Sequence, residues 1–173
     1  MTTSLGSIMA ESLNLSLNYA ERMLKDITPS MFARIATPGG VAVDSNHAAF
    51  IYGHLSLYGP RILEQLDLPA PLIPDGFDVV FSKDAKCVDD PDATIYPSME
   101  VITTAFFNGH RAVEQVLRTT PDEVFSVQNP QEGRMRELFP TLGSMHNFYL
   151  GGHMMIHLGQ LSAWRRMMGL GPA

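Results

Sequence analysis

Four stretches of this sequence repeat their apolar residues at the helical period, and this pattern constrains the fold more than any other feature. The stretches cover residues 5–25, 45–66, 98–117 and 141–168, and none shows the strict alternation that is typical of a half-buried strand. Each helix has an apolar side to cover, and four such helices can cover one another around a shared core. The sequence therefore predicts an all-α chain that forms a single four-helix-bundle domain over residues 1–173.

Boundary residues predict where these helices begin and end. Ser45–Asn46, Ser98 and Thr141 are residue types that cap helix N-termini, so the second, third and fourth helices should begin at these positions. Gly169 is a typical terminator after the last helix. Gly59–Pro60 lies inside the second helix. Because proline removes a backbone hydrogen bond and clashes with the preceding turn, we expect a kink or a short restart at this pair.

Residues 67–97 form a connection that is rich in proline, aspartate and glycine and is long for a compact domain. We expect it to cover the mouth of the bundle or to take part in function. Its apolar segment Phe77–Phe81 should pack on the core or on a partner subunit. We interpret Asp89, Asp90 and Asp92 as a solvated acidic turn, because they lack the spaced ligands and the terminal glutamate of a calcium loop.

Composition limits the class of protein. Hydrophobic residues make up 45% of the 173 residues and charged residues 17%, which is typical of a globular chain. The net charge of −6 without a basic cluster argues against a nucleic-acid surface. No window offers the ~20 apolar residues that span a bilayer, and the N-terminus lacks the pattern of a signal peptide. With Cys87 as the single cysteine, we expect a cytoplasmic protein without a disulfide framework.

Two histidines four residues apart, His153 and His157, are the strongest functional signal. On a helix they lie one turn apart on the same face, about 6 Å along the axis, and one metal ion can bridge them. Their neighbours are largely apolar, so each imidazole needs a partner for its nitrogens. His54 on the second helix is the candidate for a third ligand. Three neutral imidazoles with one open position form a typical catalytic metal shell.

Other polar residues have weaker assignments. His47 and His146 each lie seven residues from a member of this triad, about 10.5 Å along the helix axis, which is too far to chelate the same ion. We expect them to line the pocket or to cap a helix end. Tyr58 could supply a hydroxyl to the pocket, and His110 is expected to be a satisfied or half-exposed histidine. In the alternative interpretation, all these histidines are core or surface residues with separate hydrogen-bond partners.

Two motifs resemble those of the DinB-like metal-binding four-helix proteins, a family that includes YfiT-like proteins. Within Ser45–Leu55, the sequence Gly53-His54-Leu55 resembles the "GHL" signature of the family's second helix. The stretch His153–Leu161 resembles the last-helix signature "H-x-x-x-H-x-G-Q". Arg165-Arg166 and Gly169 follow it, as in the trailing "R…G" of that signature. The order of the motifs and the four-helix pattern match as well, so the resemblance covers essentially the whole chain.

The resemblance implies an up-down-down-up bundle with long crossover connections, a divalent metal and a homodimer. Zinc or nickel is usual in such proteins, with iron or manganese as further options. The resemblance also implies that Gly159-Gln160 serves close helix packing and a hydrogen bond near the site, so Gln160 is expected beside the pocket. The chain departs from the family pattern at Gly59–Pro60 and in the length of residues 67–97.

Two functional hypotheses follow. In the first, the chain is a metal-dependent enzyme in which the metal activates a water or a low-molecular-weight thiol, for thiol transfer to a small electrophile or for hydrolysis. In the second, it is a non-catalytic metal-binding bundle that acts through dimerisation or a protein partner, with Phe77–Phe81 and the methionines as the interface. Cys87 has no assigned role, and the substrate is not indicated by any motif.

Overall fold

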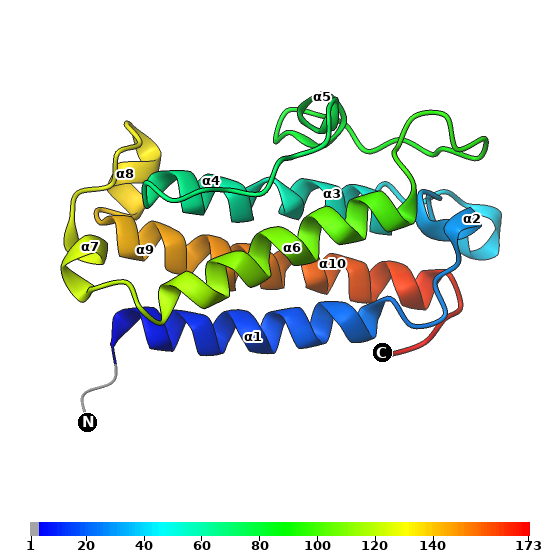
Figure 1. Ribbon diagram of the computed structural model, residues 1–173. Helices are drawn as coiled ribbons and strands as arrows, with labels where there is room; N and C mark the ends of the chain where they lie inside the picture. The colour runs from blue at the N-terminus through cyan, green and yellow to red at the C-terminus, as the bar shows by residue number, and fades with distance from the viewer. Residues whose placement is uncertain (1–3) are drawn as a thin grey trace.

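The computed structural model describes residues 4–173. In this range, every regular element longer than a single residue pair is a helix (Figure 1). Four long rods pack together, which confirms the prediction of an all-α chain with four main helices. The rods are α1 (Leu5–Met23), α3 (Ala48–Ser56) followed by α4 (Tyr58–Gln65), α6 (Met99–Leu117), and α9 (Leu142–Asn147), η2 (Phe148–His153) and α10 (Met154–Met167) in succession. The connections contain α2 (Pro29–Phe32), η1 (Pro38–Gly40), α5 (Phe77–Phe81), α7 (Asp122–Ser126) and α8 (Arg134–Leu138).

The direction of the rods explains the long connection between the second and the third. Figure 1 shows that α1 and the α9–α10 rod run one way, while α3–α4 and α6 run the other way. α6 packs against α1, α3 and α4, and α10 packs against α1 and α3. Because α3–α4 and α6 are consecutive and parallel, the chain must return along the bundle between them. Residues 66–98, with α5 at their middle, make this return over the outer side of the α3–α4 rod.

Side-chain caps begin the rods, largely where the sequence predicted them. The Ser98 hydroxyl accepts from the backbone N–H of Val101, and Thr141 forms a capping box with Ser144. The second rod differs from the prediction, because its N-cap is His47 and not Ser45–Asn46. The imidazole can take this role because its Nδ1 accepts from the Phe50 N–H at 3.1 Å.

The second rod breaks at Leu57, three residues before Pro60, and not at the predicted Gly59–Pro60 pair. Pro60 then lies in the first turn of α4, where the missing N–H has no helical partner to lose. Gly59 meets α6 closely, since an added Cβ would lie 2.6 Å from the carbonyl carbon of Gly109. The glycine therefore allows the backbones of α4 and α6 to cross in contact.

The fourth rod was predicted as one continuous helix, and this prediction is wrong in its middle. Between α9 and α10, residues Phe148–His153 form the π-helical segment η2. A π turn holds one residue more than an α turn, and one residue corresponds to a rotation of about 100°. The residues after η2 are therefore rotated relative to α9. His146 and His153 nevertheless both contact side chains of the α3–α4 rod, His146 at Gln65 and His153 at Tyr58.

The segment α5 is anchored within its own chain, because Phe77 and Phe81 are fully buried. The acidic turn that follows is more ordered than the sequence suggested. Asp90 is buried and accepts from the backbone N–H groups of Thr94, Ile95 and Tyr96 at 2.9–3.0 Å. The interpretation of this residue as a solvated acid is therefore wrong. Asp90 holds the end of the connection in a fixed turn.

A continuous cluster of buried apolar side chains from all four rods forms the core. At the end of the bundle where α1 stops, Arg165 is almost fully buried and donates to the carbonyl oxygen of Met23 at 2.7 Å and to that of Lys25. Trp164 beside it donates from Nε1 to the carbonyl oxygen of Arg34 at 2.9 Å. Within residues 4–173, no helix combines the length and the hydropathy needed to cross a membrane.

Candidate metal centre

Three imidazoles from two rods converge at the middle of the bundle. His54 lies in the last turn of α3, His153 ends η2, and His157 lies in the first turn of α10. The Nε2 atom of His153 is 3.4 Å from that of His54 and 3.2 Å from that of His157. One ring nitrogen from each residue lies within 4.8 Å of the others. The structure thus brings together the three residues that the sequence analysis selected.

Hydrogen bonds on the far side of two rings orient their lone pairs toward one another. His54 donates from Nδ1 to the carbonyl oxygen of Phe81 at 2.8 Å. His157 donates from Nδ1 to the side-chain oxygen of Gln160 at 3.1 Å. A neutral imidazole that donates from Nδ1 carries its lone pair on Nε2. The lone pairs of both residues therefore point into the cluster, toward the Nε2 atom of His153.

This arrangement fits a divalent cation. Three nitrogen lone pairs repel one another unless a positive charge lies between them, and a proton can bridge only two of them. Nitrogens bound tetrahedrally to zinc at about 2.0–2.1 Å lie about 3.3–3.4 Å apart. The two distances at His153, 3.2 and 3.4 Å, match this spacing. The three histidines therefore form a cluster that could hold a metal ion.

The three imidazoles are poised in the neutral form that a cation requires. Burial, with a contribution from the neighbouring rings of His157 and His54, lowers the pKa of His153 to about 3. Burial also lowers the pKa of His157 to about 4, again with a contribution from His54. The pKa of His54 is lowered mainly by its burial. At neutral pH all three rings are therefore unprotonated, and no proton has to leave before a cation binds.

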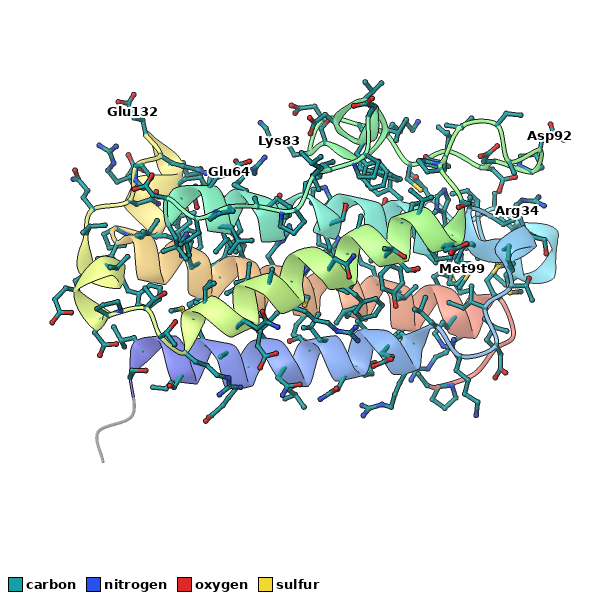
Figure 2. The ribbon with its side chains drawn as sticks, viewed as in Figure 1. Arg34, Glu64, Lys83, Asp92, Met99 and Glu132 are labelled. Atoms are coloured by element: carbon teal, nitrogen blue, oxygen red, sulfur yellow. The ribbon has the colours of Figure 1, made fainter. Side chains whose placement is uncertain are left out.

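An open pocket of about 310 Å³ gives solvent access to the cluster. Its lining consists of Asn46, Phe50, His54, Tyr58, Ser82, Lys83, Ala85, His153 and His157. Figure 2 shows Lys83 on the segment after α5, above the α3–α4 rod. Among the described residues, the lining of this pocket includes one basic side chain and no acidic one. A smaller pocket of about 190 Å³ adjoins it and shares His54, Tyr58 and Lys83.

Tyr58 belongs to the pocket, as the sequence analysis expected. Its hydroxyl oxygen lies 3.4 Å from Nε2 of His54. Its ring packs against the rings of His153 and Tyr149, with centroids 4.4 and 4.8 Å apart. Burial raises the pKa of Tyr58, so the hydroxyl keeps its proton at neutral pH. The side chain therefore presents a fixed O–H group at the edge of the cluster.

His47 and His146 lie outside the pocket lining, contrary to one of the two roles expected for them. His47 caps α3 and donates from Nε2 to the carbonyl oxygen of Val88 at 2.9 Å, which ties the long connection to the bundle. His146 is buried on α9, and its Nε2 donates to the side-chain oxygen of Gln65 at 2.9 Å. The separation of seven residues, about 10.5 Å along a helix axis, places His146 away from the cluster at His153.

Gln160 supports the cluster from outside the pocket lining. Its side-chain oxygen accepts from His157 and also from the amide of Asn46 at 3.2 Å. Gly159 beside it does not serve close helix packing, because an added Cβ would meet no atom within 4 Å. The sequence analysis took Asn46 for a helix cap, and it missed the carbonyl oxygen of Phe81. A backbone acceptor in a long connection leaves no residue-type signal that could have revealed it.

Two further groups are outside this chemistry. His110 is fully buried and donates from Nδ1 to the carbonyl oxygen of Phe106 at 2.8 Å, and burial lowers its pKa to about 4. It is therefore a core histidine and not a half-exposed one. Burial raises the pKa of Cys87 to about 11, so its thiol is protonated at neutral pH and is not activated as a nucleophile.

Comparisons of the chain with protein-family models, with curated proteins and with solved structures return no match. The family relationship that the two motifs suggest is therefore still a prediction.

Proposed function

We propose that the chain is a divalent-metal-dependent enzyme of the DinB-like type, with His54, His153 and His157 as the metal ligands. The observation that carries this proposal is the convergence of three Nε2 atoms, two of them with lone pairs oriented by hydrogen bonds at Nδ1. The order of the two motifs supports the family assignment. The up, down, down, up directions of the rods in Figure 1 and the long return over α3–α4 support it as well.

Different residues would bind the metal, orient its ligands and line the substrate pocket of such a site. The three imidazoles hold the cation, with zinc or nickel as the first candidates, and the Phe81 carbonyl and Gln160 keep two of them in register. A divalent cation supplies Lewis acidity, which lowers the pKa of a water or a thiol at its open position toward neutral. Phe50 and Tyr58 line the pocket beside the three histidines, where a small electrophile would lie. Thiol transfer or hydrolysis are the reactions that this arrangement supports.

Metal analysis of protein purified without a nickel column tests the ligand assignment. We expect the wild-type chain to carry a stoichiometric divalent metal and His153→Ala to lose it. His146→Ala is the matched control, because His146 is another histidine of the fourth rod, buried but outside the pocket. Retention of full metal content by a folded His153→Ala protein would refute the assignment.

The alternative function is a non-catalytic bundle that acts through self-association, and one observation favours it. Leu15 of α1 and Ile156 of α10 are 69% and 57% exposed, on two helices that pack side by side. Within Phe77–Phe81, the segment that the sequence suggested as the interface, the two phenylalanines are buried in their own chain and Val79 is 79% exposed. The interface proposed for this alternative is on α1 and α10, which carry Leu15 and Ile156. A homodimer built on α1 and α10 predicts that Leu15→Glu halves the molar mass measured by light scattering. An unchanged mass would count against that interface.

A further inference from the structure

The hydroxyl of Tyr58 and the proposed cation compete for the same lone pair. In the described structure the hydroxyl has one acceptor, Nε2 of His54, at 3.4 Å. Because His54 donates from Nδ1 to the Phe81 carbonyl, its remaining lone pair is the one on Nε2. A lone pair that binds a cation can no longer accept from a hydroxyl. The Tyr58 O–H group is therefore released whenever the cation is present.

The released hydroxyl has few ways to find another acceptor by moving. Tyr58 is 8% exposed, and its ring is held between the rings of His153 and Tyr149. The guanidinium of Arg61 lies 5.2 Å from the ring centroid on the same helix. A buried hydroxyl without an acceptor is costly. A water or a ligand atom in the pocket that Tyr58 lines can replace the lost acceptor.

The charge of the site defines what kind of acceptor fits. An imidazole that binds a cation through its lone pair is uncharged, so three such ligands leave the charge of a divalent cation uncompensated. The pocket lining, within the described part of the chain, adds Lys83 and contributes no carboxylate. Lys83 is 82% exposed and lies 3.7 Å from the carboxylate of Asp84, so these two charges offset each other. Asp78 and Asp84 line the adjoining smaller pocket, so the cation would be the main charge of the pocket at the three histidines. A negatively charged ligand atom compensates the cation and accepts from the hydroxyl at the same time.

We propose that the pocket takes a small anionic ligand, a thiolate or an oxyanion, whose charged atom lies at the open side of the cation and accepts a hydrogen bond from Tyr58. This inference rests on the proposed three-histidine centre and adds the residue that recognises the charged atom of the ligand. Tyr58 is then the donor that fixes where the charged atom sits. The hydroxyl remains protonated throughout, so no proton transfer is involved.

The cobalt-loaded protein offers a direct test with 2-mercaptoethanol as the probe. Binding of the thiolate to Co²⁺ produces a sulfur-to-metal charge-transfer absorption, and its titration gives the dissociation constant of the thiol. We expect Tyr58→Phe to weaken thiol binding by about tenfold to a hundredfold, the range for a hydrogen bond to a charged group. The affinity for Co²⁺ itself, measured by chelator competition, should not fall and should rise by up to about tenfold, because the hydroxyl no longer competes for the lone pair of His54.

Tyr149→Phe is the matched control, because this neighbouring tyrosine accepts from Gln131 at 3.3 Å and does not line the pocket. It should bind the thiol like wild type. Equal thiol affinity of Tyr58→Phe and wild type would overturn the inference. A large loss of Co²⁺ affinity in Tyr58→Phe would overturn it as well, because Tyr58 would then be a metal ligand. Failure of the wild-type chain to bind Co²⁺ would instead refute the three-histidine centre.

Discussion

Each ring nitrogen that faces away from the cluster determines what the opposite nitrogen can bind. For His54 and His157 this outer nitrogen has an acceptor, the Phe81 carbonyl and the Gln160 side chain. For His153 the outer nitrogen is buried and has no partner among the described residues. Ligands of metal centres usually donate from this position, and such outer contacts hold the ring orientation. Outer hydrogen bonds therefore fix the ring orientations of His54 and His157, while the ring of His153 has no such bond among the described residues.

Gln160→Leu tests this arrangement at a solvent-exposed position, where the fold itself should tolerate the change. The variant removes the acceptor of His157 Nδ1, so the ring can rotate or exchange its proton between the nitrogens. We expect metal affinity to fall by about tenfold to a hundredfold, as measured by competition with a chelator of known affinity. Gln131→Leu, which loses its contact to Tyr149, is the control. Equal metal affinity of Gln160→Leu and wild type would contradict the orienting role.

Much of the triad could be predicted from residues, while its support could not. The four-residue spacing of His153 and His157 and the two motifs pointed to the three histidines that converge in the structure. The partners of His47 and His146 depend on the Val88 carbonyl and on Gln65, which only tertiary structure brings near. Backbone acceptors carry no residue-type signal, so their contribution is invisible in a sequence.

The helices α5 and α3 contact each other beside His54, at Phe81 and Gly53. Gly53, the residue before His54, lies under the ring of Phe81, and an added Cβ would come within 2.4 Å of that ring. The carbonyl oxygen of the same phenylalanine orients His54. One residue of the long connection therefore serves both packing and ligand orientation, and glycine at position 53 makes the close approach possible.

Gly53→Ala should push α5 away from α3, because the added methyl group would overlap the ring of Phe81. Because the methyl group forces the Phe81 ring and its backbone outward, we expect a loss of about 1–3 kcal/mol in the free energy of unfolding, as for overpacked cores. Metal affinity should also fall, since the acceptor of His54 moves. Urea denaturation and chelator competition measure the two effects. Gly159→Ala, at an open position of α10, should instead stabilise by about 0.5–1 kcal/mol. If Gly53→Ala and Gly159→Ala change the free energy of unfolding equally, the contact with Phe81 is not the reason for glycine at position 53.

The existence of the elements was predictable, but their interruptions were not. Apolar periodicity marks all four rods, because it reports burial of one helical face. It does not report the break at Leu57 or the π-helical η2, whose dihedrals depend on packing between rods. The break at Leu57 is the reason why Pro60 fits at the start of α4.

For the whole molecule, buried histidines couple stability to pH. Burial lowers the pKa of His110 and of His146 to about 4, while an unfolded histidine titrates near 6.5. The unfolded chain therefore takes up protons first as the pH falls. Stability is complete above pH of about 6.5 and is lost progressively toward pH 4, where the folded chain titrates too.

Urea unfolding at pH 7.5 and at pH 5, with a chelator present, measures this coupling. The two pKa values predict that each of these histidines contributes a loss of about 2 kcal/mol between the two conditions. His110→Gln should reduce the difference by about that amount, although the variant is expected to be less stable at both values. Equal unfolding free energies of the wild-type chain at pH 7.5 and pH 5 would contradict the prediction.

The separation of the histidines along the chain also affects how the site comes into being. His54 and His153 are 99 positions apart, and the return over α3–α4 and all of α6 lie between them. On the ribosome, His54 emerges long before its two partners are made. Capture of an ion by all three residues is then one of the last events of maturation. An ion held at this position would therefore mark a chain that has been synthesised through His157 and assembled correctly.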